Sequence, residues 1–398
     1  MMSPVSPLPV VVALLLALAT VKALSWRFEP PKAMGRFVTI DGLRGYLAFF
    51  VFLHHSSVWY FYLKTGIWQE PPSNLFNHFG QSSVTLFFMI TGFLFFTKIM
   101  DGKKKEIDWI KLYTSRVLRL FPLYLFSMIL LFLTVAVLSK GVLTDSPVKL
   151  VISALRWLSF TVSGEPELNG IKGTANIVAG VTWTLSYEWC FYLCLPLLAI
   201  AIGAMSANSV LIIGIIGVLA CVLTRAAPVH LAAFGGGILA ALLVRRDWFL
   251  RIAASKVSSV IVVAAIIMVV VLFPTAYSFL PLILLTLSFA LIAGGATVFG
   301  VLSNPLSRMF GEMAYSIYLL HGIVLFTLFN FIIGKNHAGM LSPIGYWSVI
   351  SLTTPALILI CFTTFNLIEK PAMQQTEGVA RWVRYVMQTR RIVVKDAP

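Results

Sequence analysis

The chain has 398 residues, of which 59% are hydrophobic and only 11% are charged. Soluble domains carry about 25% charged residues, so a chain this apolar cannot cover a water-exposed surface, and a soluble globular protein is excluded. The formal net charge of +15 would suggest a nucleic-acid partner for a soluble protein. Here the basic residues gather in alternate loops between apolar runs, which is typical of membrane topology. We therefore expect no nucleic-acid partner.

Apolar runs of about 20 residues recur from end to end, each long enough to cross a hydrocarbon core of roughly 30 Å. They predict an all-α integral membrane protein with about eleven transmembrane helices. With the N-terminus outside and the C-terminus in the cytoplasm, roughly 23 of the 30 basic residues face inward, as the positive-inside rule requires. The expected spans lie near residues 8–24, 43–62, 79–97, 118–139, 183–203, 209–224, 229–244, 257–273, 280–300, 313–333 and 345–366.

Three regions follow from this pattern. Residues 1–25 are expected to be an uncleaved membrane anchor, because no basic segment precedes the apolar stretch as it does in a signal peptide. Residues 37–371 form the main transmembrane domain, and residues 372–398 form a basic cytoplasmic tail. The longest outward segment, about 140–182, contains an amphipathic stretch and is either a solvated connector or a substrate-binding cap.

The second expected span carries polar side chains on one face. Arg44 and His55 are eleven residues apart, so they lie within about 20° of each other on a helical wheel, and Asp41 is within about 40° of His55. His54 points about 80° away from Arg44. A histidine near mid-membrane can act as a general base, since its pKa is ordinarily close to neutral. Hydrogen bonding to a neighbouring helix explains it equally well.

Arg116 and Arg119 share a face at the inner end of the fourth expected span. Two guanidinium groups at the start of a helix suit phosphate groups. Positive-inside anchoring explains the upstream lysines Lys103, Lys104 and Lys105. Positive-inside anchoring explains less well why Arg116 and Arg119 reach into an apolar run.

Three further sets of side chains lie within apolar segments. Glu188, the sole acid of its span, must be paired or protonated there. Tyr315, Tyr318 and His321 recur every three residues and form a polar stripe, which most often bonds to neighbouring helices. The cysteines Cys190, Cys194, Cys221 and Cys361 have no His or acidic partners that would complete a metal set, and no metal is expected.

Six segments in this order resemble the membrane-bound acyltransferase-3 family, within the wider transmembrane acyltransferase superfamily, and in particular bacterial surface-polysaccharide O-acetyltransferases. Thr91 and Thr184 stand where the family has serine, and both keep a hydroxyl. The first span is additional to a family core of about ten helices. The matching segments are Asp41, Arg44 and His55; Phe87 to Phe93; Arg116, Arg119 and Pro122; Trp183, Glu188 and Tyr192; Tyr318 to His321; and Glu369 to Pro371.

The resemblance implies an O-acyltransferase of the bacterial inner membrane that uses cytoplasmic acetyl-coenzyme A as a substrate and holds no permanent cofactor. Its acceptor would be a surface or lipid-linked glycan such as lipopolysaccharide O-antigen, with membrane lipid as its surroundings. The implied catalytic residues are His55, as general base or transient acyl carrier, and Glu188. The implied donor-binding residues are Arg44, Arg116 and Arg119, and the implied supporting residues are Asp41, Tyr192, Tyr318 and His321.

Two other functions fit the same pattern. A transporter or lipid flippase would use the buried polar groups for substrate passage, although no internal repeat supports it. An acyltransferase acting on a peptide, a macrolide or an osmoregulated glucan would carry the same motifs.

Overall fold

The computed structural model describes residues 3–32, 37–102, 107–203, 211–223 and 226–395. These residues fold into helices, and no β-strand occurs among them. Two π-helical turns, Leu328–Ile332 and Phe365–Glu369, extend α14 and α16. The helices are α1 (Leu8–Ser25), α2 (Val38–Thr65), α3 (Asn74–Gly102), α4 (Trp109–Leu138), α5 (Pro147–Leu158), α6 (Thr174–Ile177), α7 (Trp183–Ala201), α8 (Leu211–Leu223), α9 (Pro228–Leu243), α10 (Asp247–Ala253), α11 (Lys256–Leu272), α12 (Phe279–Ala293), α13 (Pro305–Glu312), α14 (Ala314–Thr327), α15 (Lys335–Met340), α16 (Pro343–Thr364), α17 (Lys370–Gln374) and α18 (Thr376–Lys395).

The chain is a multi-pass membrane protein. Among the described helices, six are long and apolar enough to cross a membrane, or seven if α9 and α10, bent by 107°, form one broken span. Each of the eleven expected ranges overlaps a helix, but length and composition do not confirm eleven spans. The helices α8, α11 and α12 have only 13, 17 and 15 residues. At 28 residues α2 is long enough, but Asp41, Arg44 and two histidines interrupt its apolar run.

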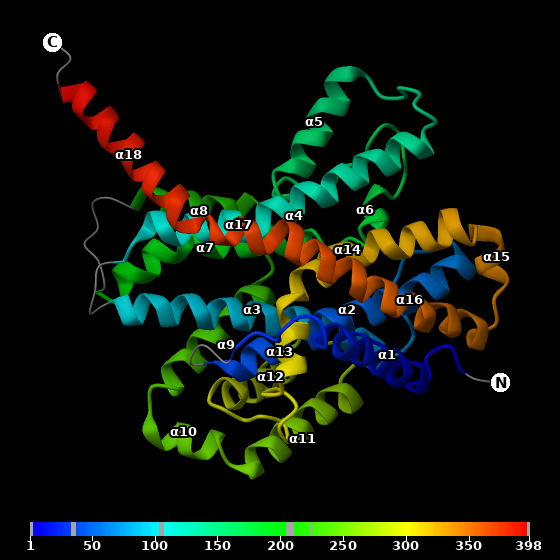
Figure 1. The fold of residues 1–398 in the computed structure, drawn as a ribbon, viewed down its shortest axis with the longest axis horizontal. Coiled ribbons are helices and arrows are strands. Elements are labelled where there is room, and N and C mark those ends of the chain that lie inside the picture. The colour runs from blue at the N-terminus through cyan, green and yellow to red at the C-terminus, as the bar shows by residue number, and fades with distance from the viewer. Residues whose placement is uncertain (1–2, 33–36, 103–106, 204–210, 224–225, 396–398) are drawn as a thin grey trace.

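Long helices run side by side around the candidate site. In Figure 1, α2, α3, α4 and α16 lie roughly along the long axis, and α5 projects away from them. Contact between α3 and α9 depends on glycine: a Cβ on Gly92 would lie 2.3 Å from the Phe234 carbonyl oxygen, and one on Gly237 would lie 2.0 Å from that of Met89. Such backbone contact is typical of helices packed in membranes.

The segment 140–182, which the sequence analysis expects on the outer side, is folded. Its amphipathic stretch forms α5, and the side chain of Asn169 holds the loops on either side of it together. The Asn169 amide oxygen accepts hydrogen bonds from the backbone N–H groups of Thr144 at 2.8 Å and Asp145 at 3.2 Å. Glu165 accepts a hydrogen bond from the Thr182 hydroxyl at the start of α7. The segment is therefore fastened to the transmembrane helices rather than loosely attached.

The basic tail forms most of α17 and all of α18, which the sequence analysis did not predict. α18 packs along the N-terminal end of α4, where Lys111 pairs with Glu377 and Arg384 pairs with Asp108. Ala380 is fully buried. These ion pairs join residues more than 260 positions apart, so no local pattern in the sequence indicates them.

Candidate active site

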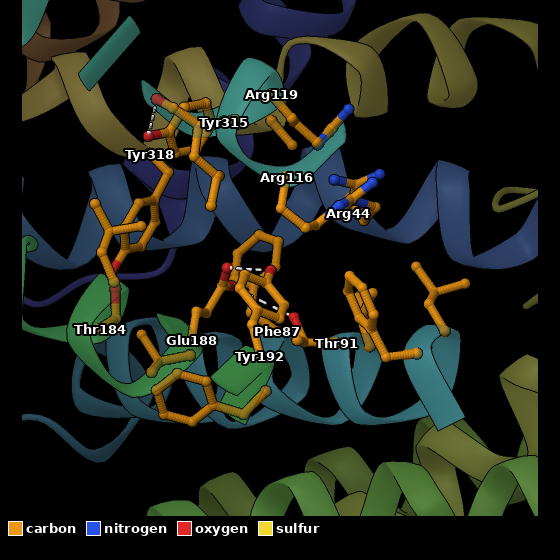
Figure 2. Close-up of a pocket in the computed structure, with 18 residues that line it drawn as sticks. Arg44, Phe87, Thr91, Arg116, Arg119, Thr184, Glu188, Tyr192, Tyr315 and Tyr318 are labelled. Atoms are coloured by element: carbon orange, nitrogen blue, oxygen red, sulfur yellow. Dashed lines mark hydrogen bonds between the residues drawn. The ribbon is translucent and has the colours of Figure 1, made fainter. Parts of the chain in front are cut away.

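A cavity of about 760 Å³ lies between α2, α3, α4, α7 and α14. Figure 2 shows three arginines gathered at one end, Glu188 and Tyr192 near the middle, and Tyr318 with Thr184 at the other end. The remaining wall is largely apolar and includes several phenylalanines from α3.

The arginine end brings together residues from two helices, with Arg44 on α2 and Arg116 and Arg119 on α4. Arg116 lies over the ring of Phe95, at 5.0 Å from its centroid. Arg119 contacts the sulfur of Met373 at 3.2 Å. Within the described residues none of the three forms an ion pair, and the buried Nε of Arg44 has no hydrogen-bond partner. All three side chains are partly buried, and cations withdrawn from water without a partner are costly, so this end is suited to an anionic ligand.

A second cavity adjoins the arginines. It has a volume of about 850 Å³ and shares Arg44 and Arg119 with the first. Lys32, Arg308 and Asp41 also line it. Arg44 and Arg119 therefore line both cavities, so one anionic ligand at these arginines adjoins both.

Glu188 lies in the middle of the first cavity. Its carboxylate accepts a hydrogen bond from the Tyr192 hydroxyl at 2.8 Å and a longer one from the Thr91 hydroxyl at 3.4 Å. No basic group among the described residues lies within 4.0 Å of it. Local hydroxyl groups therefore stabilise this carboxylate in place of an ion pair.

His55 forms a pair with His321 of α14. His55 Nδ1 lies 3.0 Å from His321 Nε2, and His321 Nδ1 lies 2.9 Å from the Ile317 carbonyl oxygen. His321 is fully buried, whereas His55 is partly exposed beside Trp68. Two imidazoles from helices far apart in sequence thus meet inside the bundle.

The hydrogen-bond partners assign the tautomers of the pair. A carbonyl oxygen only accepts, so His321 carries its hydrogen on Nδ1 and accepts at Nε2. His55 Nδ1 faces this nitrogen and also the Val51 carbonyl oxygen at 3.0 Å, so it carries a hydrogen. His55 Nε2 is left as the unprotonated nitrogen of a neutral ring. It has no partner among the described residues and is not sealed from solvent.

Tyr318 joins the cavity to the histidine pair. It lines the cavity, its hydroxyl lies 2.8 Å from the Thr184 hydroxyl, and its ring centroid lies 6.4 Å from that of His321. Arg44 and His55 are separated by about 16 Å along α2. The cavity therefore leads from the cationic end toward the histidines.

The structure gathers most of the site residues named from the sequence, in two groups. Arg44, Arg116, Arg119, Glu188, Tyr192 and Tyr318 line one cavity, and His55 and His321 pair beyond it. Asp41 is exposed and lines the second cavity. His54 turns toward α3, where its Nδ1 donates to the Phe76 carbonyl oxygen at 2.8 Å. The lysines Lys103, Lys104 and Lys105 lie outside the described residues.

Sequence reasoning missed Arg308 and Lys32 as lining residues of the second cavity. Neither belongs to a motif, and each was counted only as a basic loop residue. Arg308 is 264 positions from Arg44, so no local pattern indicates that the two line one cavity.

The comparisons with known proteins agree with this arrangement. The profile of the acyltransferase-3 family, described as an acyltransferase domain, matches residues 37–365, which hold every site residue named above except Lys32 and Met373. No curated protein and no solved structure matches the chain. The match covers more than three quarters of the sequence, and the chain is therefore a membrane-bound acyltransferase of the acyltransferase-3 family.

Proposed function

We propose that the protein is an O-acyltransferase that moves an acetyl group from cytoplasmic acetyl-coenzyme A to a hydroxyl of a glycan on the outer side of a bacterial inner membrane. The observation that carries this proposal is the cluster of three arginines, without ion pairs among the described residues, at one end of a cavity whose other end is lined by Tyr318, which packs beside the histidine pair. The proposal includes eleven membrane spans with the N-terminus outside and the C-terminus inside, an arrangement that would put the arginines at the cytoplasmic end.

The two cavities that share Arg44 and Arg119 suit coenzyme A by their chemistry. Its phosphates would bind Arg44, Arg116 and Arg119, and the basic second cavity leaves room for the nucleotide. The thin pantetheine arm would pass along the apolar wall toward Tyr318. The thioester would then lie near His55, about 16 Å from Arg44 along the helix.

The chemistry follows from the tautomers. His55 Nε2 accepts the proton of the acceptor hydroxyl, whose oxygen attacks the thioester carbonyl carbon. The carbon–sulfur bond breaks, and coenzyme A leaves as its thiol with the proton from His55. His321 Nε2 stabilises the charged His55 by accepting its Nδ1 hydrogen. Transfer through a transient acyl-histidine at the same Nε2 uses the same geometry.

The test uses purified protein in lipid nanodiscs. Coenzyme A release from acetyl-coenzyme A is followed with a thiol reagent, and acceptor glycans are analysed by mass spectrometry for an added acetyl group. We expect release to depend on the glycan and to be lost in His55→Ala. A transporter would move its substrate without consuming the donor, so passage of glycan or lipid across sealed vesicles without thiol release contradicts the proposal.

A further inference from the structure

Four ring-bearing side chains form a cluster beside the candidate active site, and the mechanism above does not use them. Trp183 and Tyr187 come from α7, His230 comes from α9, and Tyr277 comes from the loop before α12. The ring centroid of His230 lies 5.0 Å from that of Trp183, 5.2 Å from that of Tyr187 and 4.6 Å from that of Tyr277. All four side chains are partly exposed. We call this group the aromatic cluster.

The aromatic cluster keeps unused hydrogen-bonding groups. Trp183 Nε1, the Tyr277 hydroxyl and the ring nitrogens of His230 have no hydrogen-bond partner among the described residues, and none of these atoms is sealed from solvent. Tyr187 accepts a hydrogen bond from the Ala227 N–H at 2.9 Å and retains its own hydroxyl hydrogen. Polar atoms of purely structural aromatic residues are normally paired when buried. These atoms remain available to a ligand.

The cluster is held in a fixed position. The loop that carries Tyr277 is tied to α3, where His78 donates to the Phe273 carbonyl oxygen at 2.7 Å. The Gln81 side-chain oxygen accepts from the Thr275 hydroxyl at 2.7 Å and from the Ala276 N–H at 2.9 Å. Glycine contacts lock α9, which carries His230, against the same helix. Rigid support of this kind is what a binding site needs.

The cluster adjoins the cavity. Phe88 lines the cavity, and its ring contacts those of Trp183, Tyr187 and His230, with centroids 6.2, 5.8 and 5.9 Å apart. On α7, Thr184 and Glu188 face the cavity, while Trp183 and Tyr187 point about 100° away. Thr184 contacts Tyr318, which packs beside His321. A ligand on the cluster is therefore close to the histidine pair.

We propose that the aromatic cluster binds a pyranose ring of the acceptor, an inference that rests on the proposed function. A sugar ring presents C–H groups on its faces and hydroxyls at its edge, which matches aromatic rings bearing free donors and acceptors. A membrane-interface aromatic belt directs its rings toward lipid, whereas these rings contact one another and the cavity wall. In the expected orientation the starts of α7 and α9 face the outer side, from which the acceptor arrives.

The experiment uses full-length protein in nanodiscs and four probes, the methyl pyranosides of glucose, galactose, mannose and rhamnose. Binding is measured by saturation-transfer NMR without acetyl-coenzyme A, and transfer is measured by thiol release. The variants are Trp183→Ala, Tyr277→Leu and the conservative Trp183→Phe. Trp248→Ala, in α10 away from the cluster, removes a tryptophan that is 52% exposed and serves as a matched control. Donor affinity of each variant reports folding, and Tyr277→Leu carries the test if Trp183→Ala does not fold.

We expect at least one pyranoside to bind. Trp183→Ala and Tyr277→Leu should raise the pyranoside KM about tenfold or more, with unchanged affinity for acetyl-coenzyme A. Trp183→Phe should restore most of the binding, and Trp248→Ala should match the wild type. Wild-type protein that binds no pyranoside, or cluster variants with a wild-type KM, would overturn the proposal. Pyranoside binding without any thiol release would instead contradict the proposed function and leave the cluster as a sugar site.

Discussion

The two ends of the cavity differ in how their polar groups are satisfied. At the histidine end, both nitrogens of His321 and Nδ1 of His55 have hydrogen-bond partners, and Tyr318 is bonded to Thr184. At the arginine end, no guanidinium pairs with a carboxylate in the described part of the chain, and Arg44 Nε is buried without a partner. The hydrogen bonds that orient the histidine rings form without a ligand, whereas the arginine charges at the other end remain unpaired.

This difference separates two tasks. A base must be oriented before the substrate arrives, and the hydrogen bonds of the histidine pair do this at the cost of ordering both rings. A cationic site for a phosphate ligand gains most when its charges are not already neutralised by the protein. The comparison predicts that changes at the histidine end lower turnover, whereas changes at the arginine end weaken donor binding.

The largest effect is expected for His55. The variant His55→Ala should lower the transfer rate by about 10²–10⁴-fold, because it removes the general base, while affinity for acetyl-coenzyme A stays at the wild-type value. Thiol release and calorimetric donor binding measure the two quantities. His54→Ala is the matched control, since His54 bonds to the Phe76 carbonyl oxygen on α3, and it should retain measurable activity. The reverse result would move the base to His54.

Substitutions at the arginine end should weaken the binding of the acyl donor. Each charge-assisted contact contributes about 1.5–3 kcal/mol, so Arg116→Ala and Arg119→Ala should each weaken donor affinity roughly ten- to hundredfold. The kcat at saturating donor should change much less. Arg245→Ala, which removes an arginine already paired with Asp101, is a suitable control. Unchanged coenzyme A affinity in the folded double variant would refute the assignment.

His321 should act as a positioning residue. Replacing it with leucine removes the acceptor for the His55 Nδ1 hydrogen, and the resulting misplacement should lower kcat by up to about a hundredfold with little change in KM. Glutamine at this position offers a carbonyl oxygen to the same hydrogen and should restore part of the rate. If both variants lose the same activity, orientation of His55 is not the role of His321.

The smallest effect is expected for Glu188. Glu188→Gln keeps an acceptor for the Tyr192 hydroxyl but removes the charge, which should cost about 1 kcal/mol, or a five- to tenfold loss of transfer. Thr91→Ser preserves the second hydroxyl contact and should match the wild type. Full activity of the glutamine variant would rule out both charge pairing and acid–base chemistry at this position.

The sequence alone predicted the direction of a side chain where the spacing of residues along a single helix determines it. The 3.6-residue period separated His55 from His54, and the structure directs His54 to Phe76 and His55 to His321. The apolar runs located helices but not their ends. For example, α12 stops at Ala293, where two glycines follow and Gly295 adopts a φ of +121°.

Contacts between helices far apart in the chain could not be predicted from the sequence. Nothing local to His321 indicates that it meets a residue 266 positions away, and the tyrosine–histidine stripe predicted only some bond to a neighbouring helix. The aromatic cluster was missed for the same reason. Tyr277 and His230 belong to no motif. His230 meets Trp183, and Tyr277 meets His230, because α9 and the loop before α12 pack against α3.

The shared arginines between the two cavities have a consequence for permeability. In the proposed mechanism a coenzyme arm passes part of the way across the membrane, and protons and cations must not follow it. Arg44 and Arg119 line both cavities, and their positive charge opposes the entry of any cation into the apolar space beyond. The side chains that we propose to bind an anionic donor would therefore also help the cell to keep its ion gradients.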